Sequence, residues 1–108
     1  MSYKPSELDE ILRLRRGMIL HSYIYYVKDD HLISDVEFDR RAIRLVELQT
    51  KYPETLSDGS YLSREFKDFT GDTGYHLPYQ RADLIGGSER LYQSLRRYIN
   101  EHNNVHVC

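Results

Sequence analysis

The sequence predicts an all-α (mainly α) protein, with an antiparallel helical hairpin, an irregular segment and a C-terminal helix. Apolar residues recur at three- and four-residue steps in three stretches, which is the spacing of one helix face. A serine-based start signal precedes the middle stretch and a proline follows it. With 108 residues the chain is long enough for one modest core. We therefore expect a single domain over residues 1–108, divided into a hairpin (7–55), an irregular segment (56–87), a C-terminal helix (88–102) and a tail (103–108).

The composition is that of a globular protein, with 40% hydrophobic and 30% charged residues. The formal net charge is −2, so no strong direct binding to nucleic acid and no membrane binding are expected. The single cysteine, Cys108, excludes an internal disulfide framework. There is no signal peptide and no apolar run of membrane-span length, so we expect a cytoplasmic protein.

The first helix is expected to begin at Pro5-Ser6, with Ser6 as its N-cap, and to reach about residue 28. Its apolar stripe comprises Leu8, Ile11, Leu12, Met18, Ile19, Tyr23 and Tyr26. Three arginines, Arg13, Arg15 and Arg16, are expected to lie mostly off this stripe.

The second helix is expected to run from Asp35 to about Lys51. The Ser34 hydroxyl can accept the amide of Glu37, while the Glu37 side chain reaches back to the amide of Ser34, which is a capping box. Pro53 stops the helix. The expected inner face comprises Phe38, Ala42, Leu45, Val46 and Gln49.

The second half of the chain is less regular. In the irregular segment we expect a hidden short helix or strand, and Tyr61, Leu62, Phe66 and Phe69 packing back on the hairpin. Ser88 is expected to cap the last helix, and Leu91, Leu95, Tyr98 and Ile99 to form its apolar side. The preceding Gly86-Gly87 is interpreted as a turn, with phosphate binding at the helix N-terminus as the alternative.

Candidate functional residues gather at the turn between the two hairpin helices. Tyr25 and Tyr26 end the first helix, beside the start of the second. Asp35, Phe38 and Asp39 stand at i, i+3 and i+4, so they share one helix face. The carboxylates could accept hydrogen bonds from ribose hydroxyls or a carboxamide, while rings stack on a planar base. The alternative is structural, because carboxylates in a first turn and tyrosines at a helix seam are common stabilising residues.

Two runs of sequence around this turn resemble a known family. Residues 23–29, Tyr-Ile-Tyr-Tyr-Val-Lys-Asp, and 33–39, Ile-Ser-Asp-Val-Glu-Phe-Asp, are similar to the N-terminal Ia domain of bacterial NAD+-dependent DNA ligases. Glu47-Leu48 and Tyr52-Pro53-Glu54 continue the likeness, which covers about residues 7–55. Phe38 stands where the family has a tyrosine, and His31 where it has a proline in the loop.

The resemblance implies a helical module that closes over the nicotinamide mononucleotide half of NAD+ and orients it as a leaving group. A lysine of the next ligase domain then attacks the adenylyl phosphate. By motif position, the resemblance implies that Tyr25, Tyr26, Asp35, Phe38 and Asp39 bind the cofactor.

The chain does not resemble a complete ligase. None of Lys4, Lys28, Lys51 and Lys67 begins the Lys-x-Asp-Gly motif that carries the family's nucleophile. We therefore expect at most a subunit or accessory of a split ligase, acting in trans on NAD+ or nicotinamide mononucleotide beside a ligase adenylation domain. The alternative is a non-catalytic interaction protein that reuses the hairpin to bind a ligase or another replication component. A free-standing domain of this kind also suggests a phage or mobile element as its source.

Two further groups of residues are weaker candidates. His102, His106 and Cys108 have metal-ligand chemistry at helical spacing, but we expect no metal site in a terminal tail. A second basic group, Arg40, Arg41 and Arg44, is interpreted as solvated helix surface, with phosphate contact as the alternative.

Overall fold

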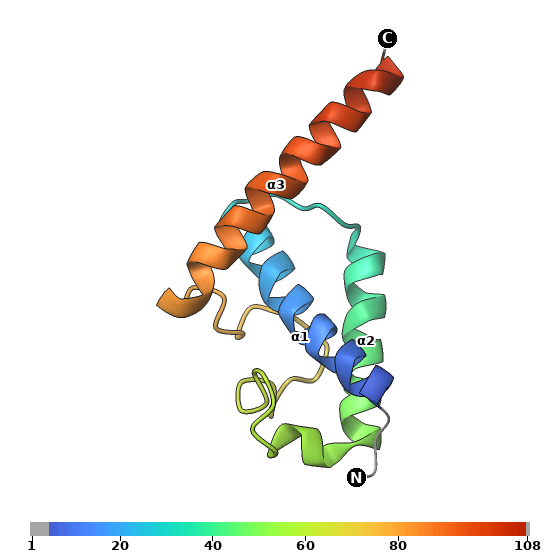
Figure 1. The fold of residues 1–108 in the computed structure, drawn as a ribbon, viewed down its shortest axis with the longest axis vertical. Coiled ribbons are helices and arrows are strands. Elements are labelled where there is room, and N and C mark those ends of the chain that lie inside the picture. The colour runs from blue at the N-terminus through green and yellow to red at the C-terminus, as the bar shows by residue number, and fades with distance from the viewer. Residues whose placement is uncertain (1–4, 108) are drawn as a thin grey trace.

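The computed structural model describes residues 5–107, and the side chains of residues 5–102. It contains three α-helices, α1 (Pro5–Tyr26), α2 (Asp35–Lys51) and α3 (Ala82–Val107), with a short 3-10 helix, η1 (Pro53–Leu56), after α2 (Figure 1). The described residues contain no β-strand, which confirms the predicted all-α class. No helix in this part of the chain is long and apolar enough to cross a membrane.

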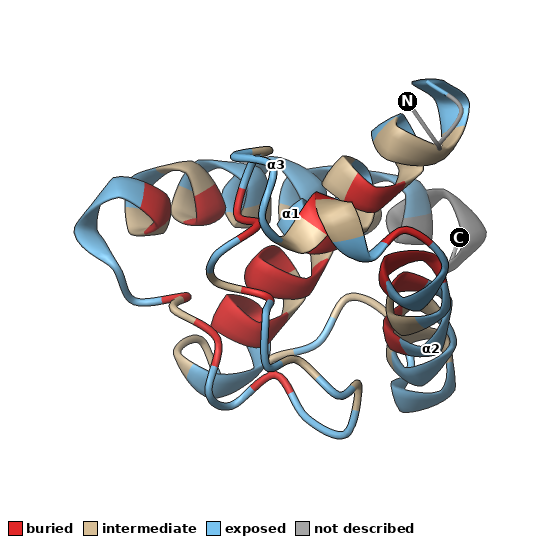
Figure 2. Cartoon of the chain, turned by 90° about the horizontal axis from the view of Figure 1, so that it is seen from below, coloured by how far each residue is buried: buried red, intermediate tan, exposed pale blue. Residues whose placement is uncertain are grey.

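The helices α1 and α2 run in opposite directions and form the hairpin (Figure 1). Their facing sides are buried, while the outer sides are exposed (Figure 2). The core comprises Ile11, Met18, Ile19, Leu20, Tyr23 and Ile24 of α1, Ala42, Leu45 and Leu48 of α2, and Tyr52, Leu62, Phe66, Leu77, Tyr79 and Leu84. The predicted inner face of α2 is largely confirmed, with Gln49 also buried and Phe38 packed against the core.

The start of α2 agrees with half of the capping prediction. Ser34 Oγ accepts the Glu37 amide at 3.0 Å. The Glu37 carboxylate does not reach back to the cap, because Arg40 and Arg41 bind it instead. These guanidinium groups lie three and four residues on, and a charge-assisted pair is stronger than a bond to one neutral amide. Both arginines lower the pKa of Glu37 to about 2.

The ends of α1 differ from the prediction by one or two residues. The helix begins at Pro5, so Ser6 lies inside it rather than at the N-cap, and it ends at Tyr26 rather than near residue 28. The chain leaves through Asp29, whose φ of 52° is left-handed. A left-handed residue stops a helix because it redirects the backbone away from the helical path.

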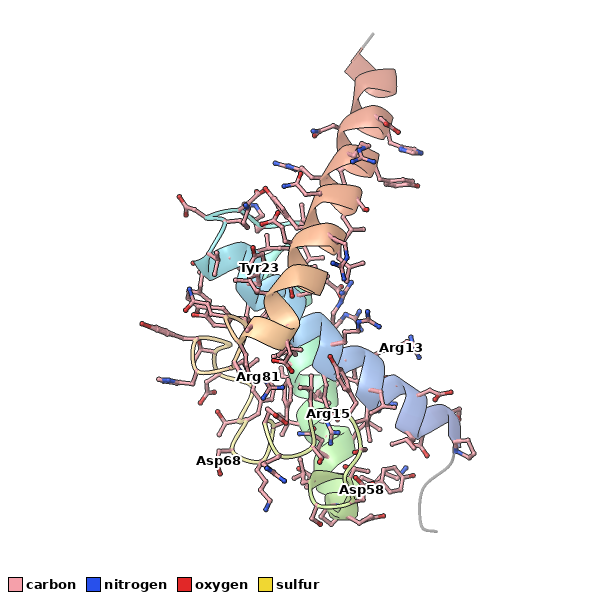
Figure 3. All side chains as sticks on the ribbon, turned by 60° about the vertical axis from the view of Figure 1, so that its left-hand side comes forward. Arg13, Arg15, Tyr23, Asp58, Asp68 and Arg81 are labelled. Carbon is pink, nitrogen blue, oxygen red and sulfur yellow. The ribbon has the colours of Figure 1, made fainter. Side chains whose placement is uncertain are left out.

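Arg15 contradicts the expectation that it lies off the apolar stripe. Its side chain is fully buried and points between the ribbons of the hairpin and the loops, whereas Arg13 points outward (Figure 3). Its guanidinium donates to Gln49 Oε1 (2.8 Å), the Thr55 carbonyl (2.8 Å), the Tyr61 carbonyl (2.9 Å) and Ser60 Oγ (3.0 Å). Burial lowers the pKa of Arg15 from its ordinary value. Arg15 thus fastens the segment after α2 to the hairpin.

The irregular segment folds back on the hairpin as expected, with η1 as its short helix. Leu62 and Phe66 are buried and Phe69 packs against the core, but Tyr61 is exposed, contrary to the prediction. Only the carbonyl of Tyr61 faces inward, where it accepts a hydrogen bond from Arg15.

The last helix is longer than predicted. It begins at Ala82 instead of Ser88 and its backbone continues to Val107, through most of the predicted tail. Gly86 and Gly87 therefore lie inside α3, which removes the proposed turn and the phosphate site at a helix start. Ser88 is buried within the helix.

The side of α3 that packs on α1 is also not the predicted one. Leu84 and Ser88 are buried, and Ile85 and Tyr92 pack against the core. The predicted apolar side is instead largely open, because Leu91, Leu95 and Tyr98 are exposed. Beyond the hairpin, α3 extends away from the rest of the protein (Figure 1).

Candidate functional site

A cleft of about 290 Å³ opens where the end of α1, the turn after it and the start of α2 meet residues 72–74. All five residues that the sequence singled out line this cleft: Tyr25, Tyr26, Asp35, Phe38 and Asp39. The hairpin brings them together because the C-terminal turn of α1 lies beside the N-terminal turn of α2.

The two tyrosines of α1 have different surroundings. The ring of Tyr26 stacks on Tyr79 at 5.5 Å and contacts Tyr75 at 5.2 Å. Its hydroxyl is 2.9 Å from Thr73 Oγ1. Tyr25 touches Tyr26 edge-on and is 54% exposed. Tyr26 is therefore a fixed part of the wall, whereas Tyr25 keeps an open ring for a planar ligand.

The opposite side of the cleft is acidic. Asp35 and Asp39 lie in the first turns of α2, and Asp72 lines the same cleft. Neither Asp35 nor Asp39 has a hydrogen bond or ion pair with another described side chain, unlike Glu37 on the same helix. Negative charge is favourable at this end of a helix, because the helix dipole is positive there. A cation or a group rich in hydroxyls suits this side.

Two polar side chains that sequence reasoning missed, His21 and Ser22, also line the cleft. His21 Nδ1 and Ser22 Oγ are buried and have no hydrogen-bond partner among the described residues. Burial, assisted by the charge of Arg41, lowers the pKa of His21 to about 4, so its imidazole is neutral at pH 7. A buried polar atom without a partner costs about 1–3 kcal/mol. His21 precedes Tyr25 by four positions and Ser22 precedes Tyr26 by four, so each shares a helix face with a tyrosine of the cleft. This spacing could have identified both residues from the sequence.

The third wall of the cleft is the turn at residues 72–74, which the sequence did not place there. Gly74 is buried so close to α1 that a Cβ on it would be 1.9 Å from Ser22 Oγ and 3.3 Å from Phe38 Cζ. Only glycine fits there, because any side chain would overlap Ser22. No periodic pattern marks this contact between distant segments.

The loop between α1 and α2 is held from outside by α3. The Asp30 carboxylate accepts hydrogen bonds from the His31 amide (2.8 Å) and the Tyr92 hydroxyl (2.9 Å). It also forms an ion pair with Arg96 at 3.4 Å. The His31 amide is the main cause that lowers the pKa of Asp30. Nearby, Tyr23 and Lys28 both donate to Glu89 of α3, at 2.7 and 3.0 Å.

The other candidates whose side chains are described do not line the cleft. Arg40 and Arg41 pair with Glu37, and Arg44 pairs with Glu10 at 2.8 Å, so this basic group is neutralised surface. His106 and Cys108 lie outside the residues whose side chains the structure describes. Within the described part of the chain, no cluster of three or more His, Cys, Asp or Glu side chains could hold a metal ion.

Comparison with known proteins gives matches that cover more than half of this chain. The family described as the DNA ligase-like, N-terminal NAD+-binding domain matches residues 4–61. The DNA ligase of Thermotoga maritima is 43% identical over 61 residues, which are 56% of this chain and 9% of the ligase. The DNA ligase of Halothermothrix orenii is 33% identical over 96 residues, which are 80% of this chain and 14% of the ligase. The chain thus spans a small part of these relatives. No solved structure matches it.

Proposed function

Because the chain belongs to the family of the DNA ligase-like, N-terminal NAD+-binding domain, we propose that its cleft binds NAD+ through the nicotinamide mononucleotide half. The observation that carries this proposal is the convergence of the five motif residues on one cleft, although they come from two helices. The volume of about 290 Å³ is at the lower limit of ligand pockets, so it suits one nucleotide half and not a whole dinucleotide.

The chemistry of the cleft fits this group. The nicotinamide ring of NAD+ is a planar cation, and the open ring of Tyr25 offers a stacking surface. Asp35 and Asp39 can accept hydrogen bonds from the ribose hydroxyls, and their negative charge stabilises the cationic ring. Phe38 keeps the aromatic surface of the family's tyrosine without its hydroxyl, so one hydrogen bond to the ligand is absent here.

NAD+ supplies an adenylyl group, and its nicotinamide mononucleotide half is the leaving group in that chemistry. The role we propose for this chain is to bind and orient the leaving half. Tyr25 and Phe38 fix the plane of the ring, and the two aspartates fix its rotation through the ribose. In this proposal the lysine nucleophile is supplied by an adenylation domain, and the chain acts in trans beside it in a split NAD+-dependent ligase. Correct orientation of a leaving group accelerates such a transfer without a covalent step by the module.

Calorimetric titration of the purified chain with nicotinamide mononucleotide and with NAD+ tests the proposal. We expect saturable binding of both ligands, and at least about a tenfold loss of affinity in Asp35→Ala, since a charge-assisted hydrogen bond is removed. Asp68→Ala is the matched control, because Asp68 is an exposed carboxylate that does not line the cleft. Absence of binding at millimolar ligand, or equal effects of both variants, would refute the proposal.

A second candidate function is suggested by α3. Leu91, Leu95 and Tyr98 of α3 are exposed, at the spacing of one helix face. An interaction protein that binds a ligase or replication component would use such a surface. This alternative predicts no nucleotide affinity, and recovery of a protein partner that Leu91→Asp abolishes in a pull-down experiment.

A further inference from the structure

His21 Nδ1 and Ser22 Oγ are adjacent in sequence, line the same cleft and are both left without a hydrogen-bond partner among the described residues. Ser22 is only 1% exposed. Buried polar side chains in folded proteins are almost always hydrogen-bonded, so two exceptions in one small cleft call for a partner that is not part of the chain.

The two atoms can take a partner that offers both a donor and an acceptor. Neutral His21 with its proton on Nε2 leaves Nδ1 as an acceptor, and the Ser22 hydroxyl can donate. A primary carboxamide is complementary to this pair, because its NH2 group donates and its carbonyl accepts. A carboxylate is not, because it only accepts and would face the lone pair of Nδ1.

We propose that His21 Nδ1 and Ser22 Oγ bind the carboxamide of the nicotinamide ring, and that this pair makes the cleft select nicotinamide over nicotinic acid nucleotides. The inference rests on the proposed binding of the nicotinamide half in this cleft. The amide NH2 donates to His21 Nδ1, and the Ser22 hydroxyl donates to the amide carbonyl. Asp35 and Asp39 add to the selection by repelling an anionic ring substituent.

Residues 72–74 cover Ser22, and the inference requires this cover to move outward when the ligand binds. Gly74 lies against Ser22 and closes its hydroxyl off from water. The cover is held to α1 by an exposed contact between Thr73 Oγ1 and the Tyr26 hydroxyl, and both Asp72 and Thr73 are exposed. The cost of opening is partly offset, because opening gives the Ser22 hydroxyl, which has no partner in the closed form, access to water or a ligand. The ligand amide enters as the cover moves outward.

The test is titration of the full chain with nicotinamide mononucleotide and with nicotinic acid mononucleotide. We expect the wild type to prefer the amide by at least about tenfold, and Ser22→Ala and His21→Leu each to reduce this preference to about threefold or less. His21→Asn is expected to retain the preference, because its side-chain oxygen can replace Nδ1 as the acceptor. Ser94→Ala, an exposed serine on α3, is the matched control and should behave as the wild type.

A third variant tests the cover. Gly74→Ala places a methyl group against Ser22 and holds the turn outward, so we expect it to bind nicotinamide mononucleotide at least as tightly as the wild type. Weaker binding by more than about threefold would contradict a cover that opens on binding. Thermal unfolding of each variant verifies that it is folded.

The outcomes separate the inference from the function on which it rests. Equal affinity of the wild type for both nucleotides overturns the inference, and so does a preference that survives both Ser22→Ala and His21→Leu. In either case, the proposed function is still supported if the wild type binds nicotinamide mononucleotide and Asp35→Ala does not. Absence of binding by either nucleotide overturns both.

Discussion

The close approach of Gly74 to α1 gives a sharp prediction about stability. A Cβ at this position would be 1.9 Å from Ser22 Oγ, whereas ordinary contact begins near 3.4 Å. In Gly74→Ala the turn must therefore move outward by about 1.5 Å, which is the difference between these distances. Overpacking of this kind costs about 1–3 kcal/mol. Because the turn is partly exposed and can shift, we expect the free energy of unfolding to fall by only about 1–2 kcal/mol.

Urea unfolding followed by circular dichroism measures this loss, and Gly17→Ala is the matched control. Gly17 lies inside α1 with nothing within 4 Å of an added Cβ. The same substitution there should stabilise the protein by about 0.5–1 kcal/mol, because alanine favours the helix. The two glycine variants are thus expected to shift the unfolding midpoint in opposite directions.

A double-mutant cycle identifies the atom responsible. Ser22→Ala removes the Oγ contact but leaves Ser22 Cβ at 3.1 Å from the added methyl group, which is still tight. We therefore expect Ser22→Ala to relieve about half of the cost of Gly74→Ala. A stability of Gly74→Ala within 0.5 kcal/mol of the wild type, which is about the error of additivity, would refute the reasoning, as would strictly additive effects of the two substitutions.

Three other predictions follow from the charges. Arg15→Met removes the donor of the Gln49 amide oxygen and the Tyr61 carbonyl, and leaves the Thr55 carbonyl with Ser60 Oγ alone. The free energy of unfolding in urea should therefore fall by about 3–5 kcal/mol, and a loss under about 1 kcal/mol would contradict this. The acidic cleft should bind NAD+ at least about fivefold more tightly than NADH, whose ring is uncharged, with the difference reduced in 1 M salt; equal affinities in titration would exclude the charge argument. The pKa of His21 is about 4 in the folded chain and ordinarily 6.5, so between these values the unfolded chain binds this proton more strongly and stability should fall as the pH is lowered. The range to measure is about pH 6.5 to 5.5, because Glu37 and Glu89, whose pKa is about 2 in the folded chain, ordinarily titrate at 4.5 and add their own loss of stability nearer that pH. Thermal melting across this range should show a shallower slope in His21→Asn, and an unchanged slope would assign the effect elsewhere.

The parts of the fold that the sequence predicted well are governed by local interactions. Ser34 can bond to the amide three residues on, whatever the rest of the chain does, and the start of α2 was accordingly predicted to the residue. Placement of the five cleft residues needed only two helices and a short connection, because an antiparallel hairpin brings the end of one beside the start of the other.

The predictions failed where distant contacts override a local preference. Gly86 and Gly87 each disfavour a helix by about 1 kcal/mol, yet burial of Leu84 and Ser88 against the hairpin makes α3 begin before them. Arg15 falls at the spacing of the buried stripe, but its charge suggested the surface. It is buried because the carbonyls that bind it come from a segment forty or more residues away, which no periodicity reveals.

The departure at His31 explains why α3 matters to a site that it does not line. A proline restricts a loop through its fixed backbone angle, and its replacement costs about 0.4–1 kcal/mol of preorganisation. In this chain the same loop is restricted by contacts to Asp30, which binds the His31 amide, Tyr92 and Arg96. Two of these three groups belong to α3, beyond the matched residues 4–61. Contacts with α3 therefore restrict the loop in this chain, as a proline in the loop would, and α3 helps to hold the cleft in shape.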